Sequence, residues 1–275
     1  MKNLSNIIAL LTDFGGRGSH YVAAMKAVML KINSNLNIID ISHNTKPFSI
    51  IEVAYLLKST YTYFPRNTVF VIVVDPGVGS KREIIALKTK DDYYFVGPDN
   101  GIFPNALKSE VTQCVKIEND HYYHKPVSKT FHGRDIMAPV GAYINQGVLL
   151  EEIGTPKLFT SLISKSLTYE VQEQKKTIKC IVQYVDNFGN ITTNIPVKKS
   201  EIVGTNITLE ENTQIIMSYR KNTMEGYFVN YFSSAPSEAL VFLVGSTGYL
   251  EISINQGNAS DVLNLSSGDV LSIIF

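Results

Sequence analysis

A carboxylate, two glycines and a guanidinium follow one apolar run, in the stretch Val71–Glu83 (VIVVDPGVGSKRE). Asp75 ends the run, Gly77 and Gly79 follow it, and Arg82 comes shortly afterwards. A carboxylate paired with a guanidinium can accept a hydrogen bond from a reacting water. Glycines let a backbone approach a ligand without obstruction by side chains. The stretch therefore predicts a catalytic or binding loop, with an ordinary turn as the alternative.

The same loop does not fit the known phosphate-binding motifs. A P-loop has Lys directly after its last Gly and then Ser or Thr, whereas the order here is Gly79, Ser80, Lys81. The glycines around Gly16 lack the spacing of the dinucleotide fingerprint. Nucleotide phosphates are therefore a less favoured ligand class for this loop.

His132 and Asp135 form a second polar group, in the segment TFHGRD before a predicted helix. The pair could ligate a metal, or His132 could build a hydrolase centre together with Asp75. A metal site is disfavoured because one convincing ligand does not make a site. For Asp135 and Arg134 the structural alternative is that the Asp at the helix start is an N-terminal cap or a partner of the helix dipole.

Alternating strand and helix patterns in the first half must position these side chains. Fully apolar strands separated by helices predict a mostly parallel sheet flanked by helices, the α/β class. Asp13 and Asp75 each follow a predicted strand, so both are expected in one crevice at the carboxyl ends of the strands. Strands are predicted at residues 7–12, 37–41 and 68–74, a hairpin at 83–88 and 93–96, and helices at 21–32, 50–60 and 135–146.

The second half loses the helical period and predicts an all-β domain, a small barrel or sandwich. A polar segment from Thr155 to Thr177 marks the connection, and we predict domains at residues 1–165 and 166–275. Strands are predicted at 177–185, 190–195, 206–209, 214–217, 239–244, 249–254 and 270–275. Two polar clusters, DNFGN (186–190) and GSTGYLE (245–251), each look like a turn when taken alone.

The composition indicates a globular protein with a small partner. Of 275 residues 44% are hydrophobic, and Lys+Arg and Asp+Glu both number 25. This balance removes the electrostatic argument for nucleic acid or an anionic membrane as the main partner. The apolar run before Asp13 is too short for a signal peptide or a membrane span, so we expect a soluble cytoplasmic protein. Cys114 and Cys180 are expected to be reduced core residues.

Seven motifs carry a family resemblance over nearly the whole chain. They are LLTDFG (10–15), DISH (40–43), VVDPGVGSKR (73–82), FVGPDNG (95–101), TFHGRDIMAPV (130–140), VDNFGNITTNI (185–195) and GSTGYLEI (245–252). In this order they resemble the S-adenosyl-L-methionine hydroxide adenosyltransferases, which are S-adenosyl-L-methionine (SAM) hydrolases related to the fluorinase and chlorinase.

The resemblance implies an N-terminal α/β domain, a C-terminal β-barrel, and a homotrimer whose sites lie between one subunit's N-terminal domain and its neighbour's C-terminal domain. It implies that SAM and water give adenosine and methionine. Asp75, Arg82 and His132 match the water-activating triad of the family, and Asp13 matches a carboxylate that holds the ribose hydroxyls. The contacts to adenosine and methionine that the resemblance implies are Asp186, Phe188, Asn190, Ser246, Tyr249 and Glu251.

The implied chemistry needs a well-placed nucleophile more than an acid. A sulfonium is already a good leaving group, so the water must be held in line with the C–S bond. Asp75 and His132 are expected to accept its hydrogen bonds while Arg82 orients Asp75, and no metal or organic cofactor is expected. Two alternatives stay open: a halide adenosyltransferase of the same fold, and a non-catalytic sensor of SAM or adenosine. Recognition of the methionine end is less defined, because Thr247 stands where the halogenating relatives have Arg.

Overall fold

The computed structural model describes residues 5–275, and the chain divides into two compact units. One unit extends to Lys165 and the other runs from Ser166 to Phe275. The N-terminal unit has two apolar cores, one on each face of a sheet, and the C-terminal unit has a main core of its own. An α/β unit followed by an all-β barrel is the fold class that the sequence predicted.

The N-terminal unit is built on one sheet with a parallel and an antiparallel part. Its strands are β1 (Ile7–Thr12), β2 (Asn37–Ser42), β3 (Val69–Val73), β4 (Ile84–Thr89), β5 (Tyr94–Pro98), β6 (Val111–Ile117) and β7 (Gly154–Pro156). Their order is β2-β1-β3-β5-β4-β6-β7. In this order the first four strands, β2, β1, β3 and β5, are parallel to one another. The strands β4, β6 and β7 then join the sheet antiparallel. The antiparallel part starts at the predicted hairpin, whose second strand, β5, lies beside β3.

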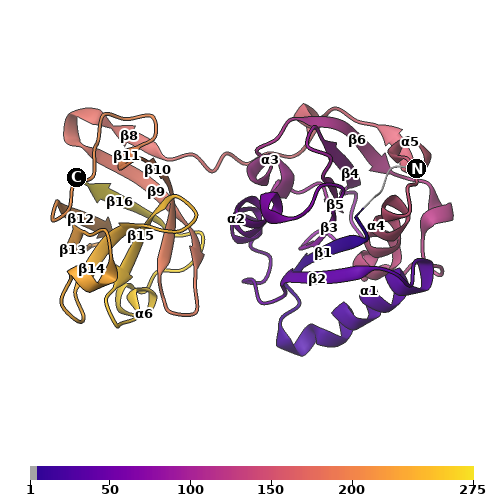
Figure 1. Cartoon of the computed structure of the whole chain (residues 1–275), viewed down its shortest axis with the longest axis horizontal. Helices are drawn as coiled ribbons and strands as arrows, with labels where there is room; N and C mark the ends of the chain where they lie inside the picture. The colour runs from indigo at the N-terminus through magenta and orange to yellow at the C-terminus, as the bar shows by residue number, and fades with distance from the viewer. Residues whose placement is uncertain (1–4) are drawn as a thin grey trace. The chain divides into compact units, whose positions relative to one another are not determined.

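Helices cover both faces of this sheet (Figure 1). They are α1 (Ser19–Ile32), α2 (Ile50–Thr60), α3 (Ile102–Ala106), α4 (Ala138–Asn145) and α5 (Leu150–Ile153). Residues of α1 and α4 pack in one core, and residues of α2 and α3 pack in the other. Alternate residues of β3 enter the two cores, so the strand is buried on both sides. This burial explains why its sequence is a continuous apolar run.

The segment that carries His132 departs from the predicted helix. A π-helical turn, Gly133–Met137, precedes α4. Asp135 does not cap this helix: it is fully buried inside the π turn, where its carboxylate accepts the N–H of Ser128 at 2.8 Å and pairs with Arg134 at 2.6 Å. Asp135 lies in the first turn, as a partner of the helix dipole would, but the expectation of a cap was wrong because this carboxylate holds the preceding loop. Among residues 5–275 no group of three His, Cys, Asp or Glu side chains could hold a metal ion.

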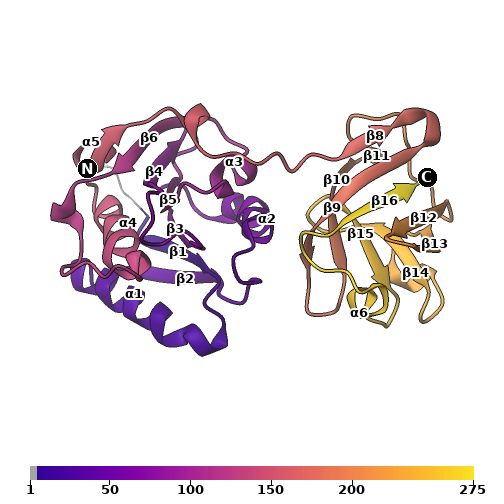
Figure 2. The ribbon, with the colours of Figure 1, turned by 180° about the vertical axis from the view of Figure 1, so that it is seen from behind.

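The C-terminal unit is a closed barrel (Figure 2). Its strands are β8 (Glu170–Gln172), β9 (Thr177–Val185), β10 (Ile191–Lys198), β11 (Glu201–Ile202), β12 (Gln214–Tyr219), β13 (Asn222–Phe228), β14 (Leu240–Val244), β15 (Tyr249–Ile254) and β16 (Val270–Ile274), with the helix α6 (Ala259–Leu263). The order β10-β15-β14-β13-β12-β16-β9 closes because β9 also pairs with β10. The strand expected at 206–209 is only an isolated bridge between Glu201 and Thr208, and β13 was missed.

The two cysteines are free and buried, as expected. Burial raises the pKa of Cys114 to about 11 and also raises that of Cys180, so neither thiol is an activated nucleophile. Within the described part of the chain, every helix is too short or too polar to cross a bilayer.

Candidate active site

One cavity of the N-terminal unit gathers the side chains of Asp13, Asp75 and His132. It measures about 250 Å³ and lies where β1 and β3 end. These strands are parallel neighbours, so the residues that follow them emerge at the same edge of the sheet. His132 comes from the π turn before α4. The structure thus brings together three residues that are widely separated in the sequence.

Arg82 joins two of these side chains in one network. Its Nε lies 2.9 Å from both carboxylate oxygens of Asp75, and its Nη2 lies 2.5 Å from Oδ2. The same Nη2 lies 2.8 Å from Nδ1 of His132. The side chains of Arg82 and Asp75 are only 10% and 7% exposed, so each charge depends on the other for compensation.

The network fixes which nitrogen of His132 carries the proton. A guanidinium can only donate hydrogen bonds, so Nδ1 of His132 must accept from Arg82. The proton of the neutral imidazole is then on Nε2. Burial and the positive charge of Arg82 lower the pKa of His132, although Asp75 and Asp135 act in the opposite direction. A neutral ring with a donor at Nε2 is therefore the favoured state.

The glycines of the 75–82 loop make room for the protein's own atoms. A Cβ at Gly77 would lie 3.1 Å from Cγ of Arg82, and one at Gly79 would lie 2.7 Å from the carbonyl oxygen of Lys129. Gly79 also has a φ of +76°, which favours glycine. These glycines were expected to admit a ligand, but Arg82 and Lys129 lie against them instead. Gly77 lets Arg82 fold back onto Asp75.

Asp13 is held by a residue that the sequence analysis missed. That residue is Phe48, whose backbone N–H donates a hydrogen bond to Oδ2 of Asp13 at 2.8 Å. Phe48 has a φ of +64°, which is rare for a bulky side chain, and its ring is 66% exposed at the wall of the same cavity. A contact made through the backbone leaves no sign in the residue type. Only the neighbouring Pro47, a turn former, gave a local signal.

A second cavity, of about 730 Å³, lies within the C-terminal unit. Five of the six residues predicted there line it: Asp186, Phe188, Asn190, Ser246 and Glu251. Tyr249 is not in this lining; it lies at the start of β15 and is 9% exposed. The lining also includes Phe232, Asn255 and Gln256, which no motif had indicated.

The carboxylate of Asp186 folds the turn that presents Phe188. Its Oδ1 accepts the N–H groups of Phe188 and Asn190, both at 2.9 Å, and its Oδ2 accepts from Nδ2 of Asn190 at 2.9 Å. Gly189 has a φ of +83°, and a Cβ there would lie 1.9 Å from Oδ1 of Asn258. The turn interpretation is therefore correct for the backbone. It leaves Phe188 77% exposed, as a flat apolar surface on the cavity wall.

Glu251 is the other carboxylate of the C-terminal cavity. Burial raises its pKa, the negative charge of Asp186 adds to this effect, and a hydrogen bond from Ser253 opposes it. The side chain packs against Gly245, where a Cβ would lie 2.8 Å from Oε2. Glu251 is therefore a partly desolvated acid next to the backbone of a glycine, and it can form a hydrogen bond with a polar ligand.

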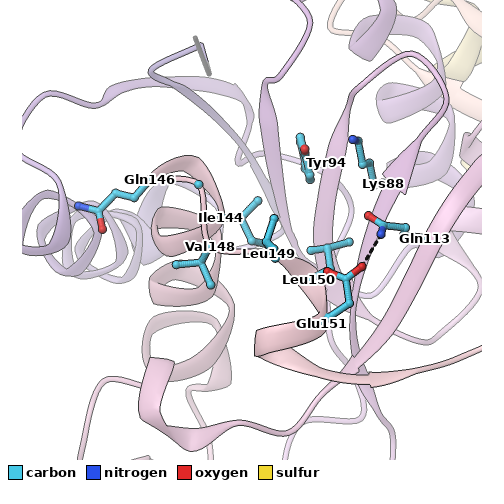
Figure 3. A pocket seen from close by; sticks show the side chains of 10 residues that line it. Lys88, Tyr94, Gln113, Ile144, Gln146, Val148, Leu149, Leu150 and Glu151 are labelled. Atoms are coloured by element: carbon cyan, nitrogen blue, oxygen red, sulfur yellow. Dashed lines mark hydrogen bonds between the residues drawn. The ribbon is translucent and has the colours of Figure 1, made fainter. Parts of the chain in front are cut away.

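The N-terminal unit has another cavity, of about 590 Å³, at the opposite edge of its sheet (Figure 3). Its lining includes Tyr94, the first residue of β5, and residues that follow α4. Its charged groups already have partners: Gln113 donates to Glu151 at 2.6 Å (Figure 3), and Lys88 pairs at 3.0 Å with Asp92, which lies outside the lining. The remaining lining is largely apolar, so this cavity presents no converging set of reactive groups.

Comparisons with known proteins point to one family. The family models described as SAM hydroxide adenosyltransferase N-terminal domain and C-terminal domain match residues 8–154 and 180–272. A protein of Methanocaldococcus jannaschii named (R)-S-adenosyl-L-methionine hydrolase is 39% identical, and the match covers 99% of this chain and 97% of that protein. A fluorinase of Actinopolyspora mzabensis is 22% identical, with 95% of each chain covered.

A solved structure shares both domains. The crystal structure of an uncharacterized conserved protein from Thermotoga maritima has a TM-score of 0.87 and 36% sequence identity to this chain. The match covers 98% of this chain and 100% of the other.

Proposed function

This chain belongs to the SAM hydroxide adenosyltransferase family, and we propose that it hydrolyses S-adenosyl-L-methionine to adenosine and L-methionine. The observation that carries the proposal is the convergence of Asp75 and His132 in one cavity, with Arg82 hydrogen-bonded to both of them. The hydrolase of M. jannaschii is much more similar to this chain than the fluorinase is, which favours water over halide as the nucleophile.

The bond changes require a base but no acid at the leaving group. The water oxygen forms a bond to the ribose C5′ while the C5′–S bond breaks. The electron pair of the C5′–S bond goes to sulfur. The sulfonium becomes the neutral thioether of methionine. The water loses one proton to Asp75, which passes it to solvent. Arg82 holds the carboxylate of Asp75 in place through Nε and Nη2, so the base is already oriented before the substrate binds.

His132 orients this water as a donor in our proposal. Its Nδ1 is engaged by Arg82, so only Nε2–H can act on a ligand in the cavity. The water would accept from Nε2–H with one lone pair, donate to Asp75, and attack C5′ with the other lone pair. This assignment replaces the expectation that both His132 and Asp75 accept from the water. Asp75 is then the only base of the triad.

The remaining site residues are proposed to hold the two ends of the substrate. Asp13 accepts hydrogen bonds from the ribose hydroxyls, and Phe188 and Asn190 bind the adenine by stacking and amide contact. Asp186, Ser246, Tyr249 and Glu251 are proposed contacts from the barrel. For Asp186 the contact is indirect in part, because its carboxylate holds the turn of Phe188.

We also propose that the chain forms a homotrimer, in which the N-terminal cavity of one copy and the C-terminal cavity of a neighbour serve one substrate. The family resemblance supports this assembly. Light scattering should then give the mass of three chains. Mixing Asp75→Asn and Asn190→Ala proteins under subunit exchange should restore activity, and a monomeric active enzyme would contradict the assembly. A cytoplasmic location remains a prediction of the sequence.

No metal or organic cofactor is needed for this reaction, because the sulfonium leaves without Lewis-acid assistance. The test is incubation of the purified protein with SAM, with and without EDTA, chloride or fluoride, followed by chromatography of the products. We expect adenosine and methionine in every case. A 5′-halo-adenosine as the main product, loss of activity with EDTA, or retention of SAM without turnover would contradict the proposal.

A further inference from the structure

The motif Asp40–His43 (DISH) has no part in the proposed chemistry, yet it forms a polar connection between the surface and buried Thr12. Thr12 Oγ1 and His43 Nδ1 share a hydrogen bond of 2.9 Å. His43 Nε2 lies 3.1 Å from Oδ1 of Asp40, an electrostatic contact without an aligned hydrogen bond. Lys26 of α1 binds Oδ2 of Asp40 at 2.6 Å. We call this connection the Thr12–Lys26 relay.

The order of groups resembles a Ser-His-Asp triad, but the relay is not built for nucleophilic catalysis. A nucleophilic hydroxyl must reach the substrate, and Thr12 is fully buried at the end of β1. The exposed end is the opposite one, where the side chains of Lys26 and Asp40 are 30% and 39% exposed. The relay therefore runs from the surface into the core and ends at Thr12.

The residue that follows the buried end is Asp13. The loop around Asp13 is tied to the segment after β2 on both sides: Thr45 Oγ1 donates to the carbonyl of Thr12 at 3.2 Å, and the N–H of Gly15 donates to the carbonyl of His43 at 2.7 Å. His43 thus holds this loop with its ring on one side and its backbone on the other. Two hydrogen bonds with one residue, on either side of Asp13, therefore hold the backbone that carries the carboxylate.

Charge stabilises the outer half of the relay. Burial acts to raise the pKa of Asp40, but the hydrogen bond from Lys26 and the electrostatic interactions with Lys26 and His43 outweigh burial and lower that pKa. Asp40 is therefore an anion at neutral pH and attracts the imidazole edge of His43. The ring is held between this anion and the Thr12 hydroxyl.

We propose that His43 and Thr12 are positioning residues that aim Asp13 at the ribose hydroxyls of the bound nucleoside. This inference rests on the proposed function, because it assumes that Asp13 holds the nucleoside. The relay acts through the loop and does not touch the substrate. Its loss should therefore affect nucleoside affinity through Asp13 alone.

Thr12→Val and Thr12→Ser provide a matched test. Valine keeps the shape of threonine without its hydroxyl, whereas serine keeps the hydroxyl. Adenosine affinity is measured by isothermal titration and thermal stability by calorimetry. We expect Thr12→Val and His43→Ala to weaken adenosine binding about five- to tenfold, the loss that accompanies one misaligned hydrogen bond. Thr12→Ser should bind within about twofold of the wild type, a change below that of one hydrogen bond.

A double-mutant cycle separates positioning from general destabilisation. In the Asp13→Ala background, Thr12→Val should weaken adenosine binding no further. Equal weakening in both backgrounds, or a lower Tm with unchanged affinity in the single variant, would overturn the inference. If the wild type binds adenosine but does not hydrolyse SAM, the proposed function fails while this test stands. If wild-type hydrolysis is normal and Thr12→Val binds adenosine normally, only the relay assignment fails.

Discussion

Two cavities of the N-terminal unit lie at opposite edges of one sheet and differ in how their polar groups are used. At the carboxyl ends of the parallel strands, Asp75, Arg82 and His132 form a network that leaves Nε2–H of His132 for a ligand. At the other edge, Gln113 and Glu151 bind each other. The cavity with Gln113 and Glu151 is larger than the cavity with Asp75, about 590 Å³ against about 250 Å³.

The comparison shows that volume is a poor guide to chemistry here. Strand direction decides instead, because loops that follow parallel strands converge at one edge and bring distant residues together. Buried charges at that edge are costly, and their retention requires pairing, as between Asp75 and Arg82. At the opposite edge, the charge of Glu151 is bound by the amide of Gln113 and that of Lys88 by Asp92.

The largest expected difference between the two edges is in turnover. Asp75→Asn keeps the shape of the side chain but removes the base, so kcat should fall by about 10²–10⁴-fold, the range for loss of general base catalysis. Adenosine affinity should change little, because the interaction is used mainly in the transition state. Steady-state kinetics with SAM and titration with adenosine provide the two measurements.

Arg82→Ala is the control for this assignment. It leaves the carboxylate without its partner, so it should lower kcat to a similar extent. The double variant should be little worse than either single variant, because both changes disable one unit. Additive losses would show that Arg82 acts separately from Asp75.

The next effect should appear in binding at the same edge. Asp13→Ala removes a charged acceptor from the ribose hydroxyls, whose hydrogen bonds are worth about 1.5–3 kcal/mol. Adenosine affinity should fall by about ten- to 150-fold. Asp13→Asn keeps the acceptor for Phe48 N–H and serves as the matched variant. Unchanged affinity in Asp13→Ala would remove Asp13 from the site.

A smaller effect should distinguish the two nitrogens of His132. The amide of glutamine can place an N–H near the position of Nε2, whereas that of asparagine reaches only the position of Nδ1. His132→Gln should therefore keep kcat within about fivefold, and His132→Asn should lose about tenfold or more, the value of one donor to the reacting water. Equal, large losses in both variants would favour His132 as a base.

The smallest effect should come from the opposite edge. Gln113→Ala removes the hydrogen bond to Glu151, and both side chains are exposed. We expect kcat/KM to stay within about twofold and the free energy of unfolding to change by less than about 0.5 kcal/mol, the usual range for surface substitutions. A tenfold loss of kcat/KM would show that the two edges are coupled and would break the comparison.

Strongly patterned elements could be predicted from the sequence, and weakly patterned strands could not. The helix predicted at residues 50–60 has those bounds in α2, because apolar residues recur there at helical spacing. The strand β13 was missed, since it contains Gly226 among polar residues. That glycine is required by packing, as a Cβ would lie 2.5 Å from the carbonyl of Leu240. Such a constraint is tertiary and leaves no local pattern.

The candidate site divides in the same way. Asp13 and Asp75 could be placed in one crevice because each follows a strand, and the family resemblance added Arg82 and His132. Contacts made by backbone groups could not be predicted, as the N–H of Phe48 on Asp13 shows. The sequence also gave no sign that Nδ1 of His132 faces a donor, because that depends on how Arg82 folds back.

The central claim is that water attacks C5′ of SAM in the cavity that contains Asp75. The most direct test is a reaction in H₂¹⁸O, with mass spectrometry of both products from wild-type and Asp75→Asn protein. We predict that wild-type adenosine carries the label on its 5′ oxygen, that methionine is unlabelled, and that Asp75→Asn gives little of either product in the same time. Unlabelled adenosine, labelled homoserine with 5′-methylthioadenosine, or wild-type label incorporation by Asp75→Asn would contradict the account.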